Sequence, residues 1–233
     1  MEGKILECVD LVKRYSNKEA LKGINLTINK GRIVGLLGPN GSGKTTFIKL
    51  ANGLLTPTAG DIRISGMKPG IDTKKIVSYL PEKTYLNEWM RVEDIIKFFK
   101  DFYEDFNEEK AYDMVRKLNV EPNAKLKTLS KGTKEKVQLI LVMSREAQLY
   151  FLDEPIAGVD PAARDYILNT IMTSYNKEST IVLSTHLIAD VEKILDDVIF
   201  INNGEIVMEK TVDEVRADEG KTVDELFREV FRC

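Results

Sequence analysis

The residues of this chain that are best suited to chemistry form a loop at positions 38–45, which reads Gly-Pro-Asn-Gly-Ser-Gly-Lys-Thr. The glycines let the backbone curl so that successive N–H groups face phosphate oxygens. Lys44 supplies a cation for the β- and γ-phosphates, and the Thr45 hydroxyl can bind Mg²⁺. The pattern therefore predicts a nucleoside triphosphate site, whose loop contacts are Gly38, Pro39, Asn40, Gly41, Ser42, Gly43, Lys44, Thr45 and Thr46.

The segments on either side of this loop favour the same interpretation. Residues 33–37 are an apolar, strand-like run. Residues 46–52 have the spacing of a helix whose N-terminus would face the anion. An ordinary glycine-rich turn is the alternative, and the complete motif disfavours it.

Two further strand-like runs also end in polar side chains. Residues 149–152 lead into Asp153 and Glu154, and residues 181–184 lead into Thr185 and His186. Because ligands of a parallel sheet bind at the carboxyl ends of its strands, the three strand ends are expected to meet at one site.

These side chains suit triphosphate hydrolysis. Asp153 is predicted to hold Mg²⁺ directly or through water. Glu154 is predicted to accept a proton from the attacking water or to orient it. His186, the single histidine of the chain, is predicted to contact the γ-phosphate. Taken alone, the two acids would be a surface turn before Pro155 and the histidine a structural residue; the phosphate loop favours the functional interpretation.

A helix is predicted to begin at Ser130, whose hydroxyl would cap it. A hydroxyl and several free N–H groups would then stand at the positive end of a helix. A plain capped helix is the alternative, and the position of Ser130 shortly before residues 149–154 favours a functional role.

The remaining pattern predicts an α/β domain with a helical insertion. Strands are expected at residues 4–9, 24–28, 60–66 and 76–80. Helical spacing then dominates from about residue 82 to residue 130, with a helix start at Asn107. A helix at about 161–175, a hairpin around Asn203-Gly204 and a final amphipathic helix ending near Phe231 complete the prediction.

Size and composition limit the classes of function. With 233 residues, the chain could be one large α/β domain or a core with a small inserted subdomain. The net charge of −3 gives no reason to expect a nucleic-acid partner. No stretch approaches the length of a membrane span, and no signal-peptide pattern is present, so a membrane role is expected to come from another chain. Cys8 and Cys233 are widely separated, as expected of thiols in a reducing cytosol.

Over essentially its full length, the chain resembles the ATP-binding cassette family, the ATPase subunits of ABC transporters. The resemblance rests on seven motifs in the order of the family. They are Tyr15 for the aromatic that stacks on adenine, residues 38–46 for Walker A, Glu82 at the Q-loop, residues 129–133 for the signature, residues 149–154 for Walker B, residues 157–160 for the D-loop and His186 for the switch histidine. For Tyr15, a core or surface aromatic is the alternative.

The resemblance implies one ABC ATPase domain over residues 1–233. It would have an α/β, RecA-like P-loop NTPase core, an N-terminal antiparallel β subdomain and an inserted α-helical subdomain at about 83–145. It also implies a head-to-tail homodimer or heterodimer that holds two ATP molecules. Each ATP would lie between the phosphate loop of one subunit and Ser130 and Gly132 of the other.

Roles for individual residues follow from the same resemblance. One set of residues is expected to stabilise charge and activate water, a second set to bind Mg²⁺, and one residue to couple the two ATP sites of the dimer. The catalytic residues are Lys44, Glu154 and His186, the Mg²⁺ residues are Thr45, Glu82 and Asp153, and the coupling residue is Asp160.

Two positions depart from the usual pattern. Glu82 replaces the customary glutamine, so an added charge stands where Mg²⁺ and a membrane subunit are expected to be sensed. The signature reads Leu-Ser-Lys-Gly-Thr in place of Leu-Ser-Gly-Gly-Gln. Ser130 and Gly132 are retained, and Lys131 adds a cation.

The leading interpretation is the energising subunit of a transporter, a cytoplasmic protein held at the inner face of the cell membrane by an integral-membrane permease. Similarity to short export-type subunits with a Leu-Pro-Glu Q-loop favours export. The alternative is a soluble ABC ATPase that acts as an assembly or regulatory factor. Residues 85–90, which include Tyr85 and Trp89, are expected to dock the permease, unless they complete the core of the helical subdomain.

Overall fold

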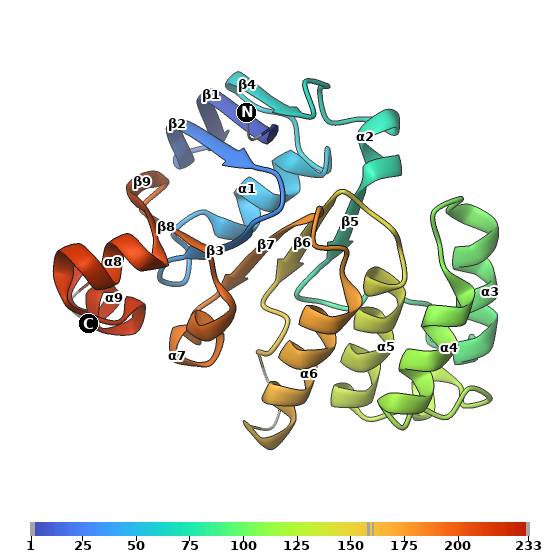
Figure 1. Cartoon of the computed structure of the whole chain (residues 1–233). Coiled ribbons are helices and arrows are strands. Elements are labelled where there is room, and N and C mark those ends of the chain that lie inside the picture. The colour runs from blue at the N-terminus through green and yellow to red at the C-terminus, as the bar shows by residue number, and fades with distance from the viewer. Residues whose placement is uncertain (1–2, 158, 160, 232–233) are drawn as a thin grey trace.

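The computed structural model describes residues 3–157, 159 and 161–231, which build two β-sheets with helices around them (Figure 1). The larger sheet has the strand order β5-β6-β7-β3-β8-β9. Each strand is parallel to its neighbour except β9, which is antiparallel to β8. The bounds are β3 Ile33–Leu37, β5 Val77–Leu80, β6 Leu149–Asp153, β7 Thr180–Thr185, β8 Asp197–Asn202 and β9 Glu205–Thr211.

The three strands that lead to the predicted site are central in this sheet. Every residue of β3, β6 and β7 is buried. A parallel strand covered on both faces reads as a continuous apolar run, and this is the pattern of all three segments in the sequence. The strands expected at residues 149–152 and 180–184 are confirmed.

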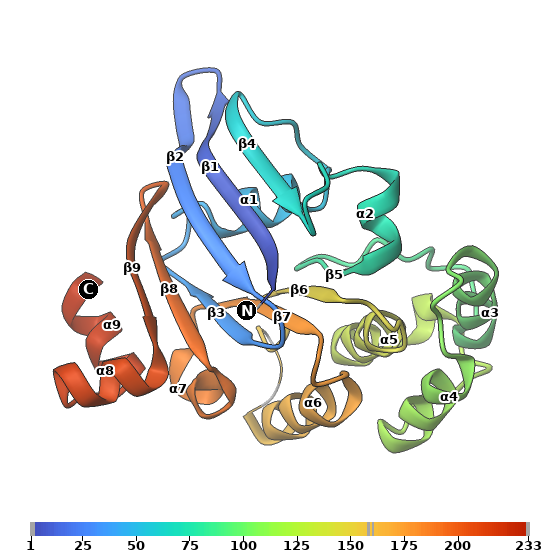
Figure 2. The same ribbon diagram turned by 45° about the horizontal axis from the view of Figure 1, so that its top comes forward.

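A smaller antiparallel sheet forms the N-terminal part of the molecule, with the order β2-β1-β4. Its strands are β1 Lys4–Tyr15, β2 Lys18–Asn29 and β4 Ala59–Ile64. The buried residues Ile24, Leu26 and Ile28 alternate with exposed ones along β2, as expected of a sheet with one face toward the core. Helix α1, Lys44–Ala51, packs between the two sheets (Figures 1 and 2).

The opposite face of the larger sheet is covered by further helices (Figure 1). Their apolar side chains join β-strand residues such as Leu152 and Phe200 in one hydrophobic cluster. The helices on this side and at the C-terminal end are α5 Lys131–Met143, α6 Pro161–Ser174, α7 Ile188–Val191, the short 3₁₀ turn η2 Glu192–Ile194, α8 Val212–Glu219 and α9 Val223–Phe231.

The predicted helical segment lies beyond the β5 edge of the larger sheet (Figure 1). It contains α3 Val92–Phe102, α4 Glu108–Lys117 and the 3₁₀ turn η1 Leu126–Thr128, and continues into α5. The Asn107 side chain caps α4 by accepting the Lys110 N–H at 3.0 Å, as its position predicts. Phe102 continues the apolar spacing of α3, but it is 67% exposed.

Within the described ranges, the sequence pattern misses three short helices, which are α2, α7 and α8. α2, Ile71–Ile76, precedes β5, and it ends at a residue that the pattern places in a strand. α8 begins after Thr211, whose hydroxyl accepts the Glu214 N–H at 3.0 Å while the Glu214 carboxylate accepts the Thr211 N–H at 2.7 Å. This Thr-x-x-Glu capping box was an available signal for α8.

None of the helices in the described ranges has the length and apolar character needed to cross a membrane.

Gly60 offers a test of the close approach between β4 and β1. Its φ is +76°, and a Cβ atom there would lie 2.0 Å from the Asp10 carbonyl oxygen. Gly66 has a similar φ of +78° with open space around it. We expect Gly60→Ala to lower the free energy of unfolding by roughly 2–4 kcal/mol and Gly66→Ala by about 1 kcal/mol, because only the first adds a clash to backbone strain. Urea unfolding measures both; equal losses would contradict the clash.

Candidate functional site

The carboxyl ends of β3, β6 and β7 meet at one cavity of about 460 Å³. The strands are in register there, since Leu37 pairs with Thr185 and Asp153 pairs with Ser184. Among the predicted site residues, those that line the cavity are Tyr15, Asn40, Gly41, Gly43, Lys44, Thr45, Thr46, Glu82, Glu154 and His186. The expectation that separate strand ends converge is therefore met.

The loop at residues 38–45 joins β3 directly to α1. Gly43 occupies the N-cap of α1 with φ +119°, and a Cβ atom at this position would lie 2.9 Å from the Ala20 carbonyl oxygen. The helix begins at Lys44, so the N–H groups of its first turn have no intrahelical acceptor and face the cavity end of the helix. This arrangement suits an anion.

Lys44 is folded back onto its own loop. Its ammonium donates hydrogen bonds to the carbonyl oxygens of Gly38 at 2.6 Å and Pro39 at 3.2 Å. Burial lowers the pKa of Lys44, and the carboxylates of Glu154, Asp153 and Glu82 oppose that shift. Three acids beside one ammonium leave an excess of negative charge, which a divalent cation bound with a triphosphate would offset.

Asp153 is buried at the end of β6 with only one of its oxygens satisfied. The hydroxyls of Ser184 and Thr45 donate to Oδ1 at 2.5 and 3.3 Å, while Oδ2 has no partner among the residues that the structure describes. Burial raises the pKa of Asp153, and these two hydrogen bonds oppose the rise. A buried carboxylate oxygen without a donor beside a threonine hydroxyl is a suitable ligand set for a hard cation.

Mg²⁺ fits these residues. Thr45, Asp153 and Glu82 supply only oxygen atoms, which is the ligand type that Mg²⁺ prefers. Within the described ranges, no three His, Cys, Asp or Glu side chains gather closely enough to hold a metal by themselves. That sparse protein set matches a magnesium ion that keeps waters and takes other ligands from a triphosphate.

Glu154 and His186 form a pair beside the phosphate loop. His186 Nδ1 lies 3.0 Å from Glu154 Oε2. Glu154 has a left-handed backbone with φ 54°, and its N–H donates to the Ser184 carbonyl oxygen at 2.9 Å. The Glu154 side chain is 11% exposed and that of His186 is 46% exposed. The imidazole can therefore orient a carboxylate that faces the cavity from a strained position.

The two signature residues lie apart from this cavity. Ser130 caps α5 by accepting the Thr133 N–H at 3.2 Å, as predicted, and neither Ser130 nor Gly132 lines the cavity. Glu88, in the segment after Glu82, is tied to the start of α5 by an ion pair to Lys134 at 2.5 Å. Asp160 lies outside the described residues.

Ser184 is a residue of the site that the sequence analysis does not single out. It is buried, it bonds Asp153 through its hydroxyl, and its carbonyl accepts the backbone N–H of Glu154. The available signal was a hydroxyl among apolar residues in a buried strand, one residue before the end of β7.

The comparisons with known proteins agree with this geometry. Residues 21–157 match the ABC transporter family. The chain is 32% identical over 212 residues to the SkfA peptide export ATP-binding protein SkfE of Bacillus subtilis (strain 168), covering 88% of this chain and 89% of that protein. It is 29% identical to the ABC-type transporter ATP-binding protein EcsA of the same organism, covering 98% and 97%.

A solved structure of the ATP-binding subunit of an ABC transporter superposes with a TM-score of 0.87 at 30% identity, covering 97% of this chain and 99% of that one. A nucleotide-free ATP-binding cassette from an ABC transporter superposes with a TM-score of 0.76 at 23% identity, which bears on the fold alone. The expected ABC ATPase fold, with its P-loop α/β core, is confirmed.

Removing the Ser184 hydroxyl tests its role beside Asp153. We expect Ser184→Ala to raise the Mg²⁺ concentration for half-maximal ATP hydrolysis roughly 10-fold or more, because outer hydrogen bonds tune metal-binding carboxylates. Titration of hydrolysis with Mg²⁺ measures the shift. Ser179→Ala is the matched control, because the Ser179 hydroxyl is also buried but donates to the Ala147 carbonyl, away from the site. An unchanged Mg²⁺ requirement in Ser184→Ala would show that this hydroxyl is dispensable.

Proposed function

The chain belongs to the ABC transporter family of ATP-binding proteins, and on this basis we propose that its ATP hydrolysis drives export through a partner membrane permease. Like the members of that family, it is an ATPase. The observation that carries the proposal is the single cavity that the phosphate loop, Glu82, Glu154 and His186 line together.

The chain's own residues account for the hydrolytic step. The triphosphate binds with its β- and γ-phosphates at the loop amides, and Lys44 turns from the loop carbonyls to the phosphate oxygens. A water oxygen attacks the γ-phosphorus as the bond to the β–γ bridging oxygen breaks, and ADP and phosphate leave. Glu154 accepts the proton of this water. His186 holds the Glu154 carboxylate and contacts the γ-phosphate.

Mg²⁺ would be held by Thr45 and Asp153, which share a hydrogen bond, with Glu82 lining the same cavity as Thr45. The ion supplies neutralisation of the negative charge on the β- and γ-phosphates. Glu82 brings a full negative charge where an amide is customary, so its role in holding the ion is a proposal specific to this chain.

Two subunits are needed to complete the site. Ser130 is exposed and caps the positive end of α5, where a hydroxyl and free N–H groups suit an anion. Because it does not line the cavity of its own chain, we assign it to the ATP held by a second subunit in a head-to-tail dimer. Asp160 is proposed to link the two sites across that interface. The dimer is a homodimer or a heterodimer.

A groove of about 550 Å³ between α3 and the core is the proposed docking site for the permease. Its apolar lining includes Tyr85 and Phe102, which are 56% and 67% exposed. Lys49, Lys74 and Lys83 also line it, and none of the residues that the structure describes places a carboxylate within ion-pair distance of these lysines. The expected occupant is a short cytoplasmic segment of the permease with one apolar face and acidic residues beside it.

Within residues 85–90, some side chains belong to the core and others are available for docking the permease. Leu86 and Met90 are partly buried and pack against the main hydrophobic cluster. Tyr85 and Trp89 are 56% and 69% exposed and are free for an interface. Their neighbour Glu88 bonds to Lys134 near Ser130, so contact at the groove has a short route to the signature.

The export direction rests on similarity. SkfE is named a peptide export protein, and the Leu-Pro-Glu sequence at residues 80–82 is that of export-type subunits. In this proposal the chain sits at the inner face of the cell membrane. An assembly or regulatory ATPase without a permease is the second candidate, and co-purification from native membranes with or without a hydrophobic subunit distinguishes the two.

Glu154→Gln tests the catalytic assignment. We expect ATP binding to be kept within about twofold and turnover to fall at least 100-fold, because the amide keeps the shape of the side chain but cannot accept a proton. Radiolabelled ATP binding and phosphate release measure the two quantities. The variant should also form a dimer in ATP on size exclusion. Turnover close to that of the wild type would remove Glu154 from the catalytic role.

Ser130→Arg tests whether Ser130 contacts the ATP that a second subunit holds. Placed in the Glu154→Gln background, it should leave nucleotide binding to the monomer unchanged and prevent the ATP-dependent dimer, since bulk and charge would enter the facing phosphate site. A normal dimer with Ser130→Arg would contradict the assignment of Ser130 to the second subunit.

Tyr85→Ala and Trp89→Ala test the docking surface. We expect recovery of the permease in pull-down to fall at least fivefold for Tyr85→Ala, which lines the groove, and less for Trp89→Ala, because buried aromatics dominate interface energies. Basal ATPase activity should be unchanged. Val230→Ala is the control, since Val230 is 45% exposed on α9, outside this groove. Full recovery with both aromatic variants would exclude residues 85–90 from docking.

A further inference from the structure

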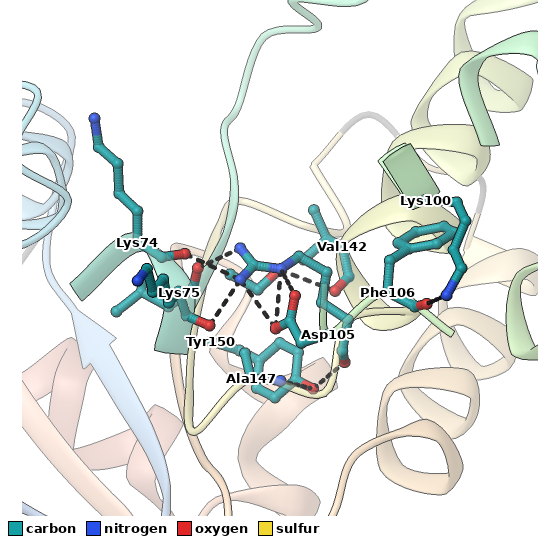
Figure 3. A network of polar contacts seen from close by, with 11 residues as sticks. Lys74, Lys75, Lys100, Asp105, Phe106, Val142, Ala147 and Tyr150 are labelled. Carbon is teal, nitrogen blue, oxygen red and sulfur yellow. Dashed lines mark hydrogen bonds and ion pairs between the residues drawn. The ribbon is translucent and has the colours of Figure 1, made fainter. Parts of the chain in front are cut away.

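A buried arginine joins the end of α5 to the core. Arg145 follows α5 by two residues and is 4% exposed. Its guanidinium bonds both carboxylate oxygens of Asp105, with the closest contacts at 2.9 Å. It also donates to the carbonyl oxygens of Val77 at 2.6 Å, Lys74 at 3.0 Å and Lys75 at 3.1 Å. The labelled Asp105, Lys74 and Lys75 surround this group in Figure 3.

These partners come from three different parts of the fold. Asp105 lies between α3 and α4, Lys74 and Lys75 lie in the last turn of α2, and Val77 begins β5. The carbonyl of Arg145 accepts the hydroxyl of Tyr150 at 2.6 Å, and Tyr150 lies on β6, the strand that ends at Asp153 (Figure 3). The Arg145 side chain therefore ties the helical segment to α2 and the sheet edge, and its backbone carbonyl adds the strand that ends at Asp153.

The surroundings make this contact stiff. The guanidinium carbon lies 4.0 Å from the centre of the Tyr103 ring. The Asp105 side chain is 22% exposed, so the pair is only partly screened by water. Next to it, the Asn107 N–H donates to the Ser144 carbonyl at 2.7 Å and the Glu146 N–H donates to the Asp105 carbonyl at 2.9 Å. Bidentate charge-assisted hydrogen bonds fix orientation as well as distance.

The other end of α5 is held by contacts nearer the surface, among them the ion pair of Lys134 with the exposed Glu88. Ser130 and Lys131 are exposed, and the Lys131 contact to Glu135 is a long one of 3.9 Å. α5 has 13 residues, which corresponds to about 20 Å of helix. A tilt of about 10° at the Arg145 end would move the Ser130 end by roughly 3.5 Å, and functional groups must be held within about 0.5 Å.

We propose that Arg145 and Asp105 form a positioning clasp that fixes the pivot of α5 and thereby the place of Ser130 relative to the phosphate loop. Arg145 and Asp105 touch no part of the nucleotide cavity, so they act through α5 and not as catalytic residues. The effect of the clasp on turnover rests on the proposed head-to-tail dimer; its effect on the direction of α5 does not.

A spin-label distance across the monomer tests the clasp directly. Labels are placed on Thr27→Cys in β2 and Lys131→Cys at the start of α5, both of which are exposed positions. Cys233 is replaced by serine. Cys8 is kept, because it is buried and burial raises the pKa of its thiol, which leaves it unreactive. Pulsed electron–electron double resonance then reports the distribution of distances between the two spin labels, in the absence of nucleotide and permease.

The test variants are Arg145→Lys, which keeps the charge but not the bidentate geometry, and the milder Asp105→Asn. Arg32→Lys is the matched control, because Arg32 forms a partly buried, bidentate pair with Asp197 at the start of β3 and β8, three or more strands along the sheet from β5. We expect both clasp variants to broaden the distance distribution at least twofold, with ATP affinity of the monomer changed less than twofold. The control should leave the distribution unchanged at a comparable loss of thermal stability.

Turnover provides the second readout. In the clasp variants the kcat of ATP hydrolysis should fall about tenfold, and Arg145→Lys with Glu154→Gln should form the ATP-dependent dimer less readily than Glu154→Gln alone. Distance distributions that superpose on the wild type in both clasp variants, or that broaden equally in Arg32→Lys, would overturn the proposal. Broadening with normal turnover and dimer formation would overturn its functional half. A failure of Ser130→Arg to block the dimer would count against the assignment of Ser130 to the second subunit and leave the distance result standing.

Discussion

The site depends on a carboxylate that is buried with one oxygen unsatisfied. Asp153 sits at the end of a fully buried strand, and within the described part of the chain only its Oδ1 has hydrogen-bond donors. A buried charge in this state is costly unless something compensates it. The Thr45 and Ser184 hydroxyls offset part of this cost at Oδ1, and the unsatisfied oxygen is available to a cation. The unsatisfied oxygen of Asp153 lowers the stability of the fold at the position where a metal ligand is needed.

The parallel sheet is what allows that arrangement. A buried parallel strand satisfies its backbone within the sheet, so the first residue past its end is the first that can turn a polar side chain into a cavity. Because β3, β6 and β7 are adjacent, three such positions come together from segments more than 100 residues apart in places, as with Thr45 and Asp153. The strained φ of Glu154 is a local consequence, since the chain must leave β6 sharply while keeping its N–H bonded to Ser184.

α5 carries a different constraint, because its two ends serve different partners. Its C-terminal end is fixed to the sheet edge by Arg145, and its N-terminal end presents Ser130 to solvent with Glu88 and Lys134 alongside. The apolar groove with its three lysines lies between the fixed end and α3. The surfaces that we propose for a nucleotide of a neighbouring subunit and for a permease therefore lie near the two ends of α5, which is a physical basis for coupling them.

Elements whose signals are local could be predicted from the sequence. The Gly-x-x-x-x-Gly-Lys-Thr loop, the buried strands before Asp153 and Thr185, and the caps at Asn107 and Ser130 are each specified within about ten residues, where backbone geometry and hydrophobic spacing act. How distant residues share the site became visible in the folded chain alone. There His186 lies against Glu154, and Ser184 bonds Asp153. Ser130 lies outside the cavity. The tertiary structure also decided that Phe102 is exposed although its spacing matches a buried stripe, and that Arg145 joins α2, β5 and the α3–α4 connection. These outcomes depend on which segments pack together, and a hydrogen bond across 40 or more residues leaves no periodicity in the sequence.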